Sequence, residues 1–475
     1  MQDSHPALAG APSRGATTRA PWRERASWAL YDFANTIFSM NVATLYFSVW
    51  FIKDLGASST LYAIGSAVSS ILVVLSVPVL GALSDARRRR KPWVVGFTIV
   101  SCLACAAIGA LGQTTLPIVG AQTIGGVAPS ATWHPSFGSL VWVIAAFTIA
   151  NYTYQAAQPF YNAMMPDLAP PDEHGRLSGI GTAVGYVGTI VGLLLVSPFF
   201  GGELPLVGPL PAGFVSALRA VVPFTEHAGR VSTFVPTALL FLLFSLPLFF
   251  FCRDHYPVME KTAANWRQAF RDVLNTLRDA RKYPGAMPFI LASFLYQDAI
   301  GTIVSFMAIY AIKAMRFPDG TETTLFLVLT IPAIFGSFLA GLLTDRIGPR
   351  RTLVLTIVGW ILLLFAMVLV PSQQAFWGVG LLIGLIFGGV PTAERPMLLS
   401  LVPREEAGRF FSLMLLSSRA AAVAGPLIWA ATVDTLEPTS GTGFAYRAAV
   451  LTVIAMFAAS LVLLRRVPDG SWSHP

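Results

Sequence analysis

The chain has 475 residues, of which 55% are hydrophobic and only 12% are charged. Soluble domains carry about 25% charged residues, so this composition excludes an ordinary soluble protein and indicates one that spans a membrane. The formal net charge is +8, but the basic residues gather in loops between apolar segments, which suits anionic lipid head groups and argues against a nucleic-acid partner.

Charged residues, Pro and Gly divide the sequence into twelve apolar segments. A helix that crosses a bilayer needs about 20 residues, and these segments are long enough. We therefore predict an all-α polytopic membrane protein with twelve transmembrane helices. The predicted spans lie near residues 22–52, 60–83, 93–112, 139–165, 177–200, 231–252, 286–312, 323–343, 352–370, 376–402, 410–433 and 445–465.

The stretch 253–285 divides the spans six and six. Its residues Trp266, Phe270 and Leu277 share one helical face, which predicts an amphipathic helix on the membrane surface, with a partner-binding helix as the alternative. The predicted organisation is a disordered cytoplasmic tail (1–20), an N-terminal six-helix bundle (21–252), this cytoplasmic linker (253–285), a C-terminal six-helix bundle (286–466) and a tail (467–475) whose end resembles an affinity tag. Most of the 32 Lys and Arg residues fall on the side of both termini, so we predict that both termini are cytoplasmic.

The first predicted span contains Asp32, and its surroundings recur in the seventh span. The pattern Asp-x-x-x-Thr-Ile-x-Ser begins at Asp32 and again at Asp298. A charged group at membrane depth costs about 3 kcal/mol or more, so it is seldom kept without a use. We hypothesise that Asp32, Asp298 or both exchange protons with water. The alternative is that they permanently neutralise Arg395 or Arg419.

Two loops also repeat between the halves. The loop Gly81–Arg90 matches Gly341–Arg350, and Pro166 with Gly175-Arg176 matches Pro403 with Gly408-Arg409. An Asp in such a loop can cap a helix end and pair with a base on a neighbouring span. We predict gating latches in which Asp85 acts with Arg89, and Asp345 acts with Arg350. The alternative is that these bases only anchor the topology.

The two loops resemble the signature loop of the major facilitator superfamily. That resemblance implies two pseudo-symmetric six-helix bundles with a substrate site between them, lined by spans 1, 4, 7 and 10. A narrower resemblance, to the vacuole-effluxer family of vacuolar amino-acid exporters and their bacterial relatives, lies in three stretches. These are Trp28–Asn35, Tyr161–Asp167 with Gly175–Gly179, and Phe294–Asp298, together with Gly408–Phe411 and Gly425-Pro426. Span 10 departs from that family at Pro391–Pro396, so its amino-acid specificity does not simply transfer.

Polar residues in span 4 recur at helical spacing and form one stripe, which would be costly against lipid. We therefore predict that it lines the cavity, with hydrogen bonding between helices as the alternative. The predicted substrate-binding residues are Tyr31, Asn35, Asn151, Tyr154, Gln155, Gln158, Asn162, Gln297 and Arg419. Arg419 lies mid-span and suits a carboxylate or phosphate. Glu394 and Arg395 are adjacent in span 10, and we predict that they form a structural pair within the gate.

These features predict a secondary active transporter that moves a small polar or zwitterionic, amino-acid-like solute by alternating access, driven by protons. The expected partners are this solute, protons and the lipid bilayer of a bacterial plasma membrane, and we expect a monomer. The alternatives are a transporter-shaped sensor or assembly factor, and a membrane-embedded enzyme. We expect no enzyme, because the sequence shows no nucleotide-binding loop, metal-ligand cluster or nucleophile triad. No cofactor and no metal are expected. The substrate, the direction of transport and the choice between H⁺ and Na⁺ remain open.

Overall fold

The computed structural model describes residues 19–87, 89–115, 136–204, 207–226, 229–254, 283–317, 321–421 and 424–469. The predicted N-terminal tail, nearly all of the predicted linker helix and the tag-like C-terminal end lie outside these residues.

The N-terminal half begins with α1 (Trp22–Phe38), which continues through two π-helical turns, η1 (Ser39–Tyr46) and η2 (Trp50–Asp54), joined by α2 (Phe47–Val49). The remaining elements are α3 (Ser59–Arg87), α4 (Lys91–Thr115), α5 (Phe137–Ala163), α6 (Met165–Leu168), η3 (Pro171–Glu173), α7 (His174–Gly201), β1 (Glu203–Leu204), β2 (Gly208–Pro209), α8 (Ala212–Val221), η4 (Arg230–Thr233) and α9 (Phe234–Phe251). The strands β1 and β2 form a short antiparallel hairpin.

The C-terminal half repeats the same order of long helices. Its elements are α11 (Ala286–Lys313), α12 (Thr321–Ile347), α13 (Pro349–Leu369), α14 (Gln373–Phe387), α15 (Gly389–Leu401), η5 (Arg404–Glu406), α16 (Ala407–Ala421), α17 (Ala424–Ser440) and α18 (Thr442–Leu464). The turns η3 and η5 occupy equivalent places, each after a Pro and before a long helix. Pro170, rather than the predicted Pro166, is therefore the counterpart of Pro403.

The described residues of the twelve predicted spans are almost all helical, and the predicted fold class is confirmed. Ten of the described helical segments are long and apolar enough to cross a membrane. The first predicted span is not among these ten. The eleventh contains residues 422 and 423, which the structure does not describe, and its described parts, α16 and α17, have only 15 and 17 residues.

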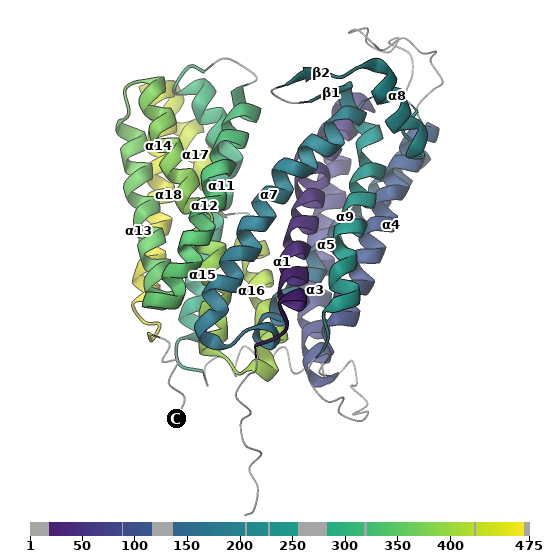
Figure 1. Cartoon of the computed structure of the whole chain (residues 1–475). Helices are drawn as coiled ribbons and strands as arrows, with labels where there is room; N and C mark the ends of the chain where they lie inside the picture. The colour runs from purple at the N-terminus through teal and green to yellow at the C-terminus, as the bar shows by residue number, and fades with distance from the viewer. Residues whose placement is uncertain are drawn as a thin grey trace, which may run out of the picture.

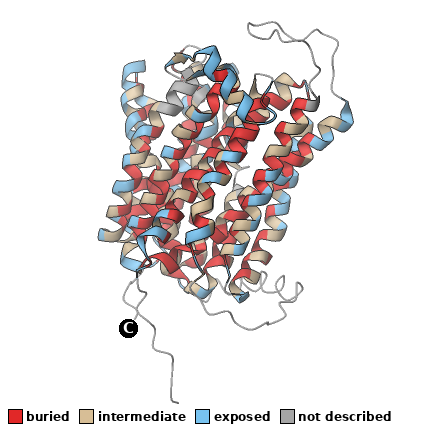
Figure 2. Ribbon diagram, turned by 45° about the vertical axis from the view of Figure 1, so that its right-hand side comes forward, coloured by how far each residue is buried: buried red, intermediate tan, exposed pale blue. Residues whose placement is uncertain are grey.

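The helices form two bundles, seen side by side in Figure 1 with α1–α9 in one and α11–α18 in the other. Each bundle has its own hydrophobic core, one around Trp28, Phe47 and Phe147, the other around Trp360, Trp429 and Phe457. Figure 2 shows buried residues inside the bundles and exposed residues along the outer helix surfaces. Many of these exposed residues are large and apolar, such as Leu103 and Leu362, as expected for helices that face lipid.

Close helix packing within the C-terminal bundle gives a first prediction, at Gly336 of α12. A Cβ added there would lie 1.6 Å from the carbonyl oxygen of Leu385 in α14, so Gly336→Ala must push two backbones apart. We expect a loss of about 1–3 kcal/mol in the free energy of unfolding, measured as a lower melting temperature. Gly378→Ala is the control, because nothing lies within 4 Å of its added Cβ. Equal melting of the two variants would contradict this packing.

Candidate functional site

An ion pair joins the two bundles near the middle of the protein. The Arg395 guanidinium in α15 donates from Nη1 to Oδ2 of Asp32 at 2.9 Å and from Nη2 to Oδ1 at 3.3 Å. Asp32 is 5% exposed, and Arg395 also lies over the rings of Trp28 and Tyr161, at 5.5 and 5.7 Å from their centroids. In this conformation Asp32 therefore neutralises Arg395, which was the alternative to its exchanging protons with water.

Glu394 does not form the predicted pair with Arg395. Its carboxylate instead accepts from the hydroxyl of Tyr296 at 2.8 Å and from Nε2 of Gln297 at 2.7 Å, both in α11. Consecutive residues of an α-helix point about 100° apart, so Glu394 faces its own bundle while Arg395 faces the other. The predicted substrate ligand Gln297 is thus used to hold Glu394.

Asp298 lies in α11 and contacts α17. Its Oδ2 accepts from the backbone N–H of Gly425 at 2.8 Å. Its Oδ1 and the hydroxyl of Thr302 are buried and have no hydrogen-bond partner among the described residues. Arg419 lies in α16, but its side chain is outside the described part of the structure.

The predicted substrate residues of spans 1 and 4 are mostly inside the N-terminal bundle. Tyr31 is fully buried, and its hydroxyl lies 2.7 Å from that of Thr98 in α4, so it does not face the other bundle as expected. Asn151 and Gln155 of α5 both donate to Ser69 of α3, at 2.8 and 3.4 Å. This is the helix-to-helix role that was the alternative for the stripe.

Other polar atoms of the predicted substrate residues make no hydrogen bond among the described residues. Buried atoms that have no hydrogen-bond partner in the described structure are Asn35 Oδ1, Gln155 Oε1, Gln158 Nε2 and Asn162 Oδ1. The predicted residue Tyr154 stacks on Phe38, with ring centroids 4.9 Å apart. An unused amide in an apolar interior is costly, so these groups are suited to bind a polar ligand or water.

A cavity of about 290 Å³ lies between the bundles, and none of the predicted substrate residues whose side chains are described lines it. Span 4 is absent from its wall, whereas spans 1, 5 and 7–10 contribute. The wall is largely aromatic and aliphatic with several hydroxyls, and no charged side chain is among its described residues. It includes Thr36, Ser39, Thr44, Tyr186, Thr189, Met307, Thr330, Trp360, Phe376, Trp377 and Phe387. Sequence alone could not separate these aromatic residues from ordinary core residues.

The cavity is closed on the side where residues 19 and 469 lie, here called the terminal side. There each bundle places an acid at the start of a helix of the other. Asp85, at the end of α3, accepts from the backbone N–H groups of Gly408 and Arg409 in α16, at 3.2 and 2.8 Å. Its counterpart Asp345, in α12, accepts from those of Gly175 and Arg176 in α7, at 2.7 and 2.9 Å. A carboxylate at a helix N-terminus satisfies free amides and the helix dipole together.

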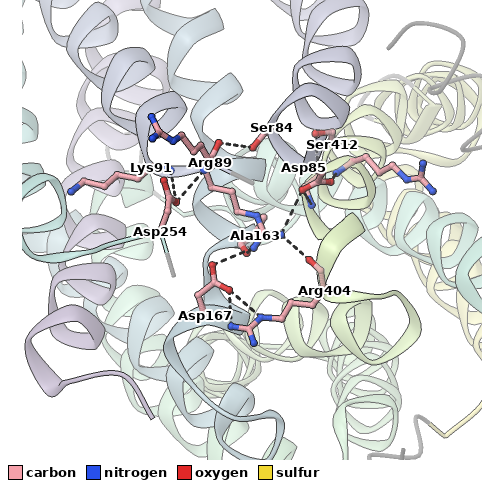
Figure 3. Close-up of polar contacts among 12 residues, drawn as sticks. Ser84, Asp85, Arg89, Lys91, Ala163, Asp167, Asp254, Arg404 and Ser412 are labelled. Carbon is pink, nitrogen blue, oxygen red and sulfur yellow. Dashed lines mark hydrogen bonds and ion pairs between the residues drawn. The ribbon is translucent and has the colours of Figure 1, made fainter. Parts of the chain in front are cut away.

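The base beside Asp85 is Arg90, and not the predicted Arg89. Arg90 lies 3.6 Å from Asp85 and 3.5 Å from Asp167, and it donates to the carbonyl oxygens of Ala163 and, at 2.7 Å, of Arg404. Arg404 returns across the interface to Asp167 at 2.7 Å (Figure 3). Arg89 is exposed, and its backbone N–H bonds to Ser84. We call Asp85, Arg90, Asp167 and Arg404 the latch network.

The predicted partner of Asp345, Arg350, is also engaged elsewhere. It binds Asp469 at 2.6 Å and the carbonyl oxygen of Leu464 at 3.1 Å, and this hydrogen bond holds the pKa of Asp469 below its usual value. The two loops are therefore alike in their acids and different in their bases.

The described hydrogen bonds between the bundles are confined to two places. Among the described residues, the hydrogen bonds that join the bundles lie at the Asp32–Arg395 pair or on the terminal side. An arrangement with a cavity between two bundles and most hydrogen bonds between the bundles on one side of it can exchange which side is closed by a rocking motion.

The sequence matches the Major Facilitator Superfamily over residues 32–426 and again over 319–475. It is 24% identical over 455 residues to the uncharacterized MFS-type transporter YxiO of Bacillus subtilis (strain 168), covering 94% of this chain and 95% of that protein. It is 25% identical over 279 residues to the multidrug resistance protein MdtG of Rahnella sp. (strain Y9602), covering 58% of this chain and 60% of that protein.

Two solved structures show the same fold at low sequence identity. The transporter FucP in its outward conformation is 12% identical, with a TM-score of 0.66 over 94% of this chain and 98% of that one. The human organic anion transporter MFSD10 is 15% identical, with a TM-score of 0.64 over 93% of this chain and 99% of that one.

Proposed function

The chain belongs to the major facilitator superfamily, and we propose that this secondary transporter moves a small polar or zwitterionic solute by alternating access, driven by protons. The observation that carries the proposal is the one-sided closure. The backbone caps of Asp85 and Asp345 hold the bundles together on the terminal side, and each can form or break as the bundles rock.

We assign the terminal side to the cytoplasm of a bacterial cell. This assignment rests on the excess of Lys and Arg on the side of both termini, which is typical of cytoplasmic loops. The cavity then communicates with the outside in this conformation. We expect the protein to act as a monomer, because each chain contains both bundles and the cavity between them.

Proton coupling is proposed for Asp32 and Asp298. The Asp32–Arg395 pair spans the two bundles, so opening the terminal side separates its charges. Asp32 then needs a new positive partner, which a proton or a cationic group of the substrate can supply. Asp298 has one buried oxygen without a partner among the described residues, which leaves room for a bound proton there.

The proposal of an amino-acid-like substrate rests on the family resemblance around Trp28–Asn35. A second substrate class is supported by the cavity wall. The cavity wall is aromatic and lacks a charged side chain among its described residues. Such a wall favours an amphipathic or uncharged molecule, since a buried charge without a partner is costly. Transport of such molecules is therefore the second candidate, and one relative is named a multidrug resistance protein.

Transport by purified protein in proteoliposomes tests the proposal. We expect an imposed pH gradient to drive accumulation of an accepted solute, while Asp32→Asn exchanges solute but no longer accumulates it. Amino acids and amphipathic dyes, compared in the same vesicles, separate the two substrate classes. Solute movement that is equally fast with and without the gradient would refute proton coupling, and the absence of movement for every solute would refute transport.

A further inference from the structure

Three acids lie well within the spans, Asp32, Asp298 and Glu394, and Glu394 differs from the other two in its hydrogen-bond partners. Asp32 meets a guanidinium and Asp298 meets a backbone amide. Glu394 is 5% exposed, and among the described residues its two oxygens accept only from the neutral side chains of Tyr296 and Gln297. A buried carboxylate without a positive partner is expensive, and binding a proton removes that expense.

Arg395, the base that follows Glu394, binds an acid of the other bundle. Both terminal nitrogens of Arg395 bind Asp32 of α1, and the side chain also lies against Trp28 and Tyr161. Because Glu394 and Arg395 are consecutive, an ionised Glu394 attracts the guanidinium through space, although the two side chains point in different directions. The two acids therefore compete for one cation, and only one of them binds it across the bundle interface.

We propose that Glu394 couples proton uptake to closure of the terminal side, by deciding whether Arg395 stays on Asp32. When Glu394 is protonated, Arg395 is held by Asp32 alone and bridges the bundles. When the proton leaves, the Glu394 carboxylate attracts Arg395 and weakens the bridge. This inference rests on the proposed transport function, and it adds a third proton site, on the C-terminal bundle.

Among the described residues, few other charged or titratable groups lie around Glu394. Tyr296 faces it from α11, and Arg395 follows it in α15. Asp32 and Tyr161 face Arg395 from α1 and α5. The helix α7 contributes Tyr186, and the described membrane-depth residues of α12 and α13 (328–341 and 352–369) contain no charged group. Asp345 and Arg350 lie at the terminal-side ends of those helices.

The sign of the pH effect follows from this competition. Protonation of Glu394 favours the bridged conformation, so by linkage the bridged conformation favours protonation. Raising the pH removes the proton and shifts the population toward a conformation in which the terminal side is open. Lowering the pH restores the bridge as long as Asp32 remains ionised.

Spin labels on the full chain in nanodiscs test the proposal directly. We place them at Asp172→Cys in η3 and Glu405→Cys in η5, two exposed equivalent positions on different bundles. Between about pH 5 and about pH 9, the population with a long label-to-label distance should rise at least about fivefold, the lower end of ordinary coupling between sites. Glu394→Gln should remove this rise and keep the short distance. Asp434→Asn, which removes an exposed acid of α17, should still show the rise of the long-distance population with pH.

Two outcomes would overturn the inference. One is a Glu394→Gln protein that opens with pH as the unmodified protein does. The other is loss of the response in Asp298→Asn but not in Glu394→Gln, which would assign it to Asp298. A melting curve excludes misfolding of each variant. If proteoliposomes transport a solute but the distance ignores pH, this inference fails and the transport function stands. If the distance follows pH but nothing is transported, the transport function fails.

Discussion

Arg395→Gln is expected to lower the free energy of unfolding by about 3–5 kcal/mol, the usual cost of removing one partner from a buried ion pair. The pair is buried on both sides, since the side chains of Arg395 and Asp32 are 13% and 6% exposed. Glutamine leaves the Asp32 carboxylate without its cation at membrane depth. The expected result is a lower melting temperature in detergent, together with a shift toward a conformation open on the terminal side.

Two comparisons separate this effect from a general loss of charge. The double variant Asp32→Asn/Arg395→Gln should recover most of the lost stability, because no charge is then left unpaired. Arg230→Gln breaks the Asp54–Arg230 pair, whose side chains are 31% and 24% exposed, and should cost only about 0–1 kcal/mol. Melting of Arg395→Gln no lower than that of Arg230→Gln would show that the buried pair does not hold the bundles.

The fold was predictable because hydropathy reports directly on burial in lipid. Twelve apolar segments separated by charges leave little choice of architecture once lipid requires every backbone group to be satisfied within helices. The details that hydropathy missed are local. The π-helical turns after Phe38 and the contact of Asp298 with Gly425 depend on tertiary packing.

Only those contacts of the site that follow from general helix geometry could be predicted from the sequence. The caps by Asp85 and Asp345 follow a general preference of helix N-termini, and the structure places both acids there. The expected pair of Glu394 and Arg395 could have been rejected from sequence, since residues i and i+1 of a helix do not face each other. The choice between Arg89 and Arg90 could not be made, because neighbouring bases in a loop carry no periodicity.

The polar stripe of α5 shows a different limit. Helical spacing correctly placed Asn151 and Gln155 on one face, but spacing does not say which neighbour that face meets. In the structure it meets Ser69 of α3. The cavity wall is formed by residues such as Trp360 and Phe387, whose patterns match those of a hydrophobic core.

Removal of both helix caps should open the terminal side even though the Asp32–Arg395 pair remains. Each of Asp85 and Asp345 accepts from two backbone amides of the opposite bundle, and loss of a cap typically costs about 0.5–2 kcal/mol. The two sites lie on different helix pairs, so their effects should add. Asp85→Ala/Asp345→Ala should therefore weaken closure by about 1–4 kcal/mol, roughly a five- to several-hundred-fold change in the equilibrium.

Alkylation of a buried interface position measures this opening, and one acid provides a matched control. Ser412 of α16 is fully buried against Gly81 of α3, so Ser412→Cys should react with a thiol reagent only when the bundles part. Asp254 also accepts from two backbone amides, those of Arg90 and Lys91, but within one bundle. Asp254→Ala should therefore lower the melting temperature without raising the alkylation rate of Ser412→Cys. The double cap variant should raise that alkylation rate. Equal rates in these two variants would mean that the caps stabilise single helices and do not close the protein.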